Sequence, residues 1–222
     1  MFNQIHKALR VWMYDTATLI NQTDFDNPEQ TSVATERLHQ LLDMFDNHAD
    51  HEDTLVFPLL QPYEPSVVEA LEQEHVTDHA LVQRLKGFLL ALDHAVSTEA
   101  KTELGHSLNT AFIDFMVFNL QHMKKEETVI NNLLWRYYSD PDLVAVSQKI
   151  VASIPPAESA IASRWMFKAL SNHEISGWLR TVERNAPNHV FRPLLTLAEK
   201  ELDPERFRYI QEEISEGALI TS

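Results

Sequence analysis

The chain has 222 residues, which is enough for one domain with a substantial appendage and a sizeable buried core. Hydrophobic residues make up 44% and charged residues 23%, a composition typical of folded globular proteins and not of disordered chains. The formal net charge of −15 opposes binding to a phosphate backbone, so we expect no nucleic-acid partner. Cysteine is absent, which excludes disulfides, thiolate zinc sites, iron–sulfur clusters and cysteine nucleophiles, whereas histidine occurs 11 times.

No segment of the sequence predicts a membrane span. The best apolar stretch, Phe112 to Phe118, is interrupted by Asp114, and no stretch reaches the roughly 18 residues that a spanning helix needs. The N-terminal sequence MFNQIHKALR is not a basic segment followed by an apolar one, so it predicts no secretion signal. We therefore expect a cytoplasmic protein with no membrane partner.

Four long segments carry apolar residues at the spacing that one face of an α-helix requires. They span residues 2–21, 27–57, 66–96 and 102–138. Asn27-Pro28 supplies an N-cap residue followed by proline at the first helical position, and three prolines between Phe57 and Ser66 separate the second segment from the third. Because the connections are short, these segments predict an up-down-up-down antiparallel four-helix bundle.

The pattern changes after Ser139-Asp140-Pro141, where four or five shorter helices are divided by prolines. Strand signals are weak along the whole chain. We therefore predict an all-α protein that consists of a four-helix bundle over residues 1–139 and a smaller C-terminal helical extension over residues 140–222, packed on the bundle.

Five histidines and two glutamates interrupt the apolar stripes of the predicted bundle helices. These residues are His6, His48, Glu52, His75, His79, His122 and Glu126. Three of the helices carry their residues as an i, i+4 pair, the spacing that stacks two side chains on one helical face. A buried polar cluster costs several kcal/mol unless its members have partners, and imidazoles with carboxylates are a suitable ligand set for borderline divalent metals.

The depths of these residues within the bundle agree. With turns near residues 63 and 99, the pairs of the second, third and fourth helices differ in depth by roughly 2–5 Å, less than one helical turn. His6 fits more loosely, because the loop near residue 25 is long. The seven residues are therefore predicted to converge on one layer and to bind metal there.

The other histidines have the ordinary interpretation of surface residues. They are His39, His94, His106, His173 and His189. His51 is the closest rival ligand, but it lies off the stripe, and Asp50 and Asp53 beside it indicate a solvated edge. Asn119, three residues before His122, is a candidate for a buried polar group that supports a ligand.

A ferritin-like di-iron bundle would instead use Glu-x-x-His motifs. The chain contains three of them, Glu36-x-x-His39, Glu72-x-x-His75 and Glu103-x-x-His106. Only His75 belongs to the predicted layer, because His39 and Glu72 point off their stripes and the third motif lies near a loop. We therefore reject this alternative.

The motifs in their order resemble the hemerythrin family, including the bacterial domains named for their His-His-Glu cation site. The order is one histidine on the first helix, H-x-x-x-E on the second, H-x-x-x-H on the third and H-x-x-x-E on the fourth. The segments HADHEDTLVFPLL and HMKKEETVINNLL are similar to the second- and fourth-helix sequences of the family. The resemblance covers residues 1 to about 138, and the tail is similar to extensions of some bacterial members.

The resemblance implies two non-haem iron ions bound by the seven residues. It assigns His75, His79 and His122 to one iron, His6 and His48 to the other, and Glu52 and Glu126 as bridges together with an oxo or hydroxo group. Zinc or manganese would be substitutes, because imidazole and carboxylate discriminate weakly among such metals. Oxygen-carrying members have H-x-x-x-x-D on the fourth helix, which puts oxygen carriage in doubt here and leaves Glu127 as an alternative to Glu126.

The implied function is a di-iron protein that binds, senses or reacts with a small oxidant such as dioxygen, nitric oxide or peroxide at an open iron position. The alternative is an iron- or oxygen-responsive regulatory module whose C-terminal helices contact a protein partner or a second copy of the chain. No Ser/His/Asp order and no glycine-rich loop indicates a nucleophilic enzyme, so any activity would be di-iron redox chemistry.

Overall fold

A computed structural model describes residues 2–220 of the chain, with the side chains of residues 2–215. Four long helices form the bundle: α1 (Asn3–Gln22), α2 (Pro28–His51), α4 (Pro65–His94) and α5 (Thr98–Lys125). Two π-helical turns, η1 (Glu52–Val56) and η2 (Glu126–Ile130), continue α2 and α5 into the short helices α3 (Phe57–Leu60) and α6 (Asn131–Tyr137). No strand occurs among the described residues.

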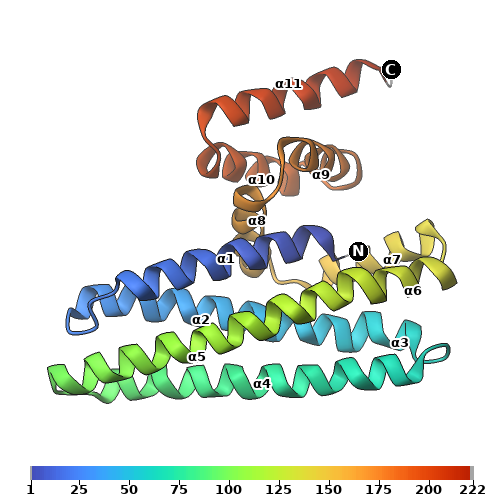
Figure 1. Cartoon of the computed structure of the whole chain (residues 1–222). Coiled ribbons are helices and arrows are strands. Elements are labelled where there is room, and N and C mark those ends of the chain that lie inside the picture. The colour runs from blue at the N-terminus through green and yellow to red at the C-terminus, as the bar shows by residue number, and fades with distance from the viewer. Residues whose placement is uncertain (1, 221–222) are drawn as a thin grey trace. The chain divides into compact units, whose positions relative to one another are not determined.

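Five shorter helices follow the bundle. They are α7 (Asp140–Ser153), α8 (Pro156–Ala169), α9 (Asn172–Asn185), α10 (Asn188–Glu201) and α11 (Pro204–Ile220). The predictions of an all-α class, a four-helix bundle and additional C-terminal helices are therefore confirmed (Figure 1). None of the helices in the part of the chain that the structure describes has the length and apolar character needed to cross a membrane.

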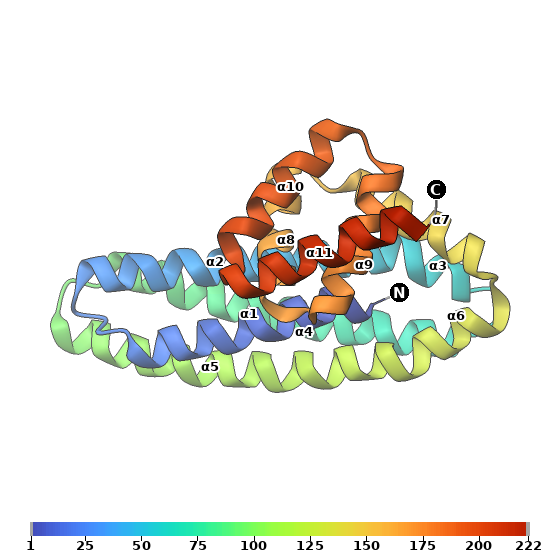
Figure 2. The ribbon, with the colours of Figure 1, turned by 90° about the horizontal axis from the view of Figure 1, so that it is seen from above.

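Contacts divide the chain into two compact units. The first comprises Trp12–Ser153 with the first residues of the chain, and the second comprises Gln4–Val11 with the chain from Ile154 onward. In the first unit, α2, α4 and α5 run along one another, and short loops connect them (Figure 1). In the second unit, α9 packs against α11, and α10 contacts α8, α9 and α11 (Figure 2). The predicted domain boundary at residue 139 stays a prediction.

Side-chain caps begin several of these helices where the sequence places them. Asn27 accepts hydrogen bonds from the backbone amides of Glu29 and Gln30 at 3.0 and 3.2 Å, and Pro28 follows at the first helical position of α2. Ser171 and Glu174 form a reciprocal capping box at the start of α9. These caps satisfy amide groups that the first turn of a helix leaves without partners.

Apolar side chains fill the bundle on both sides of one polar level. Toward the start of α2 the interior holds Leu38, Leu41 and Phe45, with the ring of Phe45 edge-on to that of Phe115. Beyond the π-helical turns a second cluster is formed by residues that are at most 9% exposed: Phe2, Val56, Phe57, Leu60, Val68, Leu71, Ile130, Leu134 and Leu143. The polar level therefore lies between two dry layers, which limit the access of water to it.

The second unit has a hydrophobic core of its own. Its buried members are Phe167, Leu170, Ile175, Leu179, Ala198, Leu202, Phe207 and Ile210. Trp178 packs on the ring of Phe167 with centroids 5.0 Å apart.

An ion pair also forms within the second unit. Lys7 donates to Glu174 at 2.5 Å, and this contact, together with the hydrogen bonds from Ser171, lowers the pKa of Glu174 to about 2.

An added methyl group should have opposite effects on stability at two glycines. In α5, the Cβ of Gly105→Ala would overlap the buried ring of Phe25, so we expect a loss of about 1–3 kcal/mol in the free energy of unfolding. In α4, a Cβ at the exposed Gly87 meets nothing within 4 Å, so Gly87→Ala should gain up to about 1 kcal/mol from helix propensity. Urea denaturation of both variants measures the difference, and equal effects would contradict the packing at Phe25.

Candidate metal centre

The two buried glutamates of the polar level occupy equivalent places in two similar segments. The sequences EDTLV and EETVI form η1 and η2, and each π-helical turn begins at its first glutamate. The amide of Phe57 donates to the carbonyl of Glu52, and the amide of Asn131 to that of Glu126, which are i→i+5 bonds. Such turns are rare and are frequent at functional sites. No feature of the sequence predicts the wider turns, although both segments share the pattern H-x-x-x-E-[D/E]-T.

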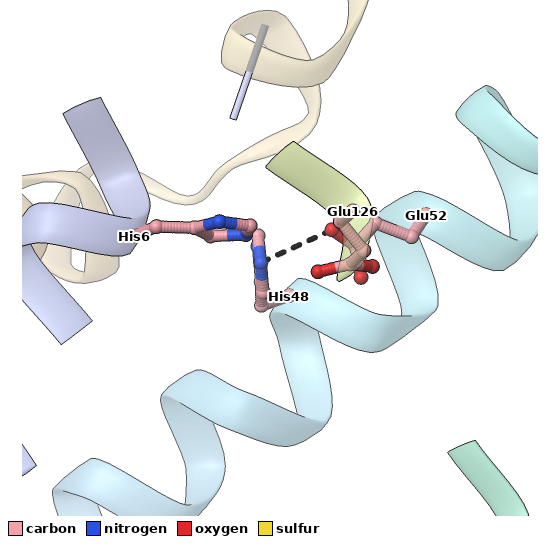
Figure 3. A group of neighbouring side chains, drawn as sticks. All are labelled: His6, His48, Glu52 and Glu126. Carbon is pink, nitrogen blue, oxygen red and sulfur yellow. Dashed lines mark ion pairs between the residues drawn. The ribbon is translucent and has the colours of Figure 1, made fainter. Parts of the chain in front are cut away.

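Two groups of four side chains bring donor atoms together. In the first group, one donor atom each of His6, His48, Glu52 and Glu126 lies within 4.8 Å of the others (Figure 3). In the second group, the same holds for Glu52, His75, His122 and Glu126. Both glutamates belong to both groups, and each group adds two imidazoles of its own. The structure therefore brings together six of the seven residues predicted from the sequence.

The second group is compact. The Nε2 atoms of His75 and His122 lie 3.1 Å apart. His122 Nε2 lies 3.2 Å from Glu126 Oε1, and His75 Nε2 lies 3.4 Å from Glu52 Oε2. In the first group, His48 Nε2 lies 3.1 Å from Glu52 Oε1. The donors of both groups thus converge at the level of the two shared carboxylates.

These separations fit a common metal ion. Two donors that bind one ion at about 2.1 Å, and at roughly a right angle to each other, are about 3 Å apart. The measured separations of 3.1–3.4 Å correspond to that arrangement. Nitrogen and oxygen donors in equal number suit borderline divalent metals, including iron, manganese and zinc.

The electrostatics of the two carboxylates also fit a cation. Glu52 is 2% exposed and Glu126 is 0% exposed. Burial raises the pKa of Glu52 well above its usual range, and the neighbouring Glu126 carboxylate adds to the shift. Burial alone would also raise the pKa of Glu126, but the hydrogen bond from His122 and its charge lower it. Two ionised carboxylates at this depth require positive charge between them, and without it the raised pKa of Glu52 favours its protonated form.

Each imidazole of the second group also contacts an outer carboxylate. His75 Nδ1 lies 2.8 Å from Asp53 Oδ1, and His122 Nδ1 lies 2.8 Å from Glu74 Oε2. Lys125 donates to the other oxygen of Glu74, and these contacts lower the pKa of Glu74 although burial opposes the shift. The sequence interpretation assigned Asp53 to a solvated edge and did not identify Glu74. The available signal was their position directly beside Glu52 and His75.

His79 is the predicted ligand that the structure does not bring to the cluster. Its side chain is 64% exposed, and its Nδ1 lies 3.8 Å from Asp46 Oδ1 on α2. The interior place on this turn of α4 belongs to Asp78, which accepts a hydrogen bond of 2.6 Å from the buried amide of Asn119. Burial raises the pKa of Asp78 although this hydrogen bond opposes the shift. Asn119 is thus a buried polar group at this level, bonded to a carboxylate and not to an imidazole.

The spacing of the buried positions along α4 explains why His79 points outward. Along α4 they alternate by three and four residues: Val68, Leu71, His75, Asp78, Val82, Leu85, Leu89 and Leu92. The members of each pair, His48/Glu52 and His122/Glu126, are four residues apart and both belong to a donor group, whereas the next buried position after His75 on α4 is only three residues further. His79 therefore points outward, and the alternation read from the apolar residues alone would have identified Asp78.

The remaining sequence predictions concern residues outside the two groups. The five histidines expected at the surface are all exposed. His51 Nε2 lies 3.1 Å from the hydroxyl of Ser153, and neither His51 nor Glu127 belongs to a donor group. In the three Glu-x-x-His motifs only His75 is buried. The rejection of a ferritin-like site is consistent with this placement.

Comparison with protein families matches residues 2–134 to the hemerythrin HHE cation-binding domain. This segment is more than half of the chain and contains both donor groups. No curated protein and no solved structure matches the chain. The chain therefore belongs to the hemerythrin family of HHE cation-binding proteins.

Proposed function

We propose that the bundle binds two iron ions and that the pair interacts with a small oxidant. His6 and His48 would hold the first ion, His75 and His122 the second, and Glu52 and Glu126 would bridge the two. His79 is left out of this set because its side chain is 64% exposed. The observation that carries the proposal is that two four-donor groups share both buried glutamates.

The number of donor residues favours two ions over one, and the charge balance permits two. A single ion held by the second group would use four of the six donor residues and would not use His6 and His48. Two divalent ions bring +4 against −2 from the bridging carboxylates, and one oxo or hydroxo group would reduce the remaining charge further. The buried carboxylates are then neutralised in place, which a dry interior requires.

The donor count leaves room for a ligand. Each ion would receive two imidazoles and two carboxylate oxygens from the protein, fewer donors than the six that iron commonly takes. When bound, iron at such a site would supply reversible coordination and redox chemistry toward dioxygen, nitric oxide or peroxide. The apolar layers on either side of the polar level would limit the entry of water.

Metal quantification and spectroscopy of the purified protein test the proposal. We expect about two iron ions per folded chain, and an absorption spectrum that changes when nitric oxide or hydrogen peroxide is added to the iron-loaded protein. Zinc or manganese in the same stoichiometry would support the two-ion site but not the native metal. One ion per chain at saturation, or a spectrum indifferent to every one of these ligands, would contradict the proposal.

A second function rests on the separate core of the C-terminal unit. In this alternative the bundle reports iron or oxygen, and the C-terminal helices contact a protein partner or a second copy of the chain. Hydrogen exchange with and without iron distinguishes the two functions. Protection that changes in α8–α11 while the spectrum ignores small ligands favours the regulatory module.

A further inference from the structure

We propose that Asp53 and Glu74 are positioning residues that hold His75 and His122 in the tautomer and orientation needed to bind the second ion. The inference rests on the proposed di-metal function and assigns two residues outside the donor groups to it. It concerns one half of the centre only, because the imidazoles that these carboxylates contact both belong to the second group.

The contact between His75 and Asp53 fixes the proton of one ring. A carboxylate only accepts hydrogen bonds, so at 2.8 Å the Nδ1 of His75 is the donor to Asp53. A neutral imidazole with its proton on Nδ1 has its lone pair on Nε2, the atom that faces Glu52 and His122. Phe57 stacks on this ring with centroids 5.2 Å apart and restricts its plane. The position of the proton on the His75 ring and the orientation of the ring are therefore both fixed.

His122 is held in the same way from another helix. Its Nδ1 donates to Glu74 at 2.8 Å, and its ring stacks on Phe118 with an interplanar angle of 10°. Lys125, one turn further along α5, donates to the second oxygen of Glu74. Glu74 therefore has a fixed direction, although its side chain is 25% exposed.

The contacts of His75 and His122 with the outer carboxylates orient both Nε2 atoms toward the same gap. When both rings are neutral and carry their proton on Nδ1, both Nε2 lone pairs face the 3.1 Å gap between the rings. Two lone pairs at that distance repel each other unless a cation or a proton lies between them. The outer carboxylates thus prepare a pair of donors that a metal ion can bind without ring rotation or a change of tautomer, and they also raise the basicity of both rings.

The test replaces each carboxylate by a side chain that cannot accept a hydrogen bond. We compare Asp53→Leu and Glu74→Leu with Asp50→Leu and Glu72→Leu, which change exposed acids three and two residues away along the chain. Zn²⁺ titration of the full chain by calorimetry gives the affinity of each ion. We expect the first two variants to keep one tight site and to bind the other ion about 10–100-fold more weakly, with both controls unchanged. Asp53→Asn and Glu74→Gln, which retain an acceptor oxygen, should recover part of the loss.

The outcomes separate this inference from the proposed function. If the unaltered chain binds fewer than two Zn²⁺, the di-metal function fails. If it binds two and the Asp53 and Glu74 variants bind both with unchanged affinity, or lose both, the positioning role is overturned. Nitrogen-15 NMR of the Zn²⁺-loaded unaltered chain gives an answer that needs no variant to fold. Protons on Nδ1 of His75 and His122 support the inference, and protons on Nε2 overturn it.

Discussion

Replacing Glu52 by glutamine should abolish tight binding of both metal ions. Glu52 offers a donor to both groups, so this single substitution removes charge and an anionic donor from each ion at once. Loss of a supporting residue around a metal lowers affinity by about 10–100-fold, and loss of a shared direct ligand should exceed that for each ion. Metal content per folded chain measures the effect, and circular dichroism checks that the helices persist.

The matched control for Glu52→Gln is His39→Gln in α2, the helix that η1 continues. His39 is exposed and belongs to a Glu-x-x-His motif, so a ferritin-like centre would depend on it. We expect the His39 variant to retain about two ions per chain. If it loses them while the Glu52 variant keeps them, the proposed ligand set is wrong.

Removing the metal should destabilise the bundle, and more so at high pH. Binding that occurs only in the folded state adds about 4 kcal/mol when the free metal is 1,000 times its dissociation constant. For a chain of this size that corresponds to an unfolding temperature about 8–16 °C higher. Thermal unfolding with and without chelator gives the difference, and equal unfolding temperatures for loaded and metal-free protein would refute the coupling between metal and fold.

The pH dependence follows from His122 in the metal-free protein. Burial alone would lower its pKa, but the hydrogen bonds to Glu126 and Glu74 raise it from 6.5 to about 9. A pKa raised in the folded state contributes stability that is fully present below pH 6.5 and is lost as the pH rises through about 9. The loss for this group is on the order of 3 kcal/mol. The raised pKa of Glu52 acts in the same direction, with stability lost as the pH rises above the ordinary glutamate value.

The loaded protein should not show this loss over the same interval, because His122 is neutral both in the metal-bound form and in the unfolded chain above pH 6.5. Metal binding requires neutral imidazoles, so metal affinity rises as His122 loses its proton. The difference in stability between loaded and metal-free protein should therefore widen from pH 6.5 to 9. A difference in stability that is constant over this interval would show that His122 does not exchange its proton for metal. The control variant His94→Gln, at an exposed position, should leave the widening of the difference unchanged.

The helices and most of the donor set could be predicted from local patterns. Helical periodicity requires only neighbours along the chain, so the pairs His48/Glu52 and His122/Glu126 could be placed on single faces without knowledge of the fold. The depth of each pair follows from the rise per residue and the position of the turns. The same rule misplaced His79, because the buried face of α4 advances by three residues after His75 and not by four.

The sequence by itself thus determined the all-α bundle, its family and the level at which polar residues interrupt the core. Only the tertiary structure decided that both glutamates belong to both donor groups, and that Asp53 and Glu74 reach imidazoles 22 and 48 residues away. Those contacts depend on how far each helix is rotated about its own axis against its neighbours. The packing of side chains between helices sets that rotation, and a periodic pattern along one helix does not contain it.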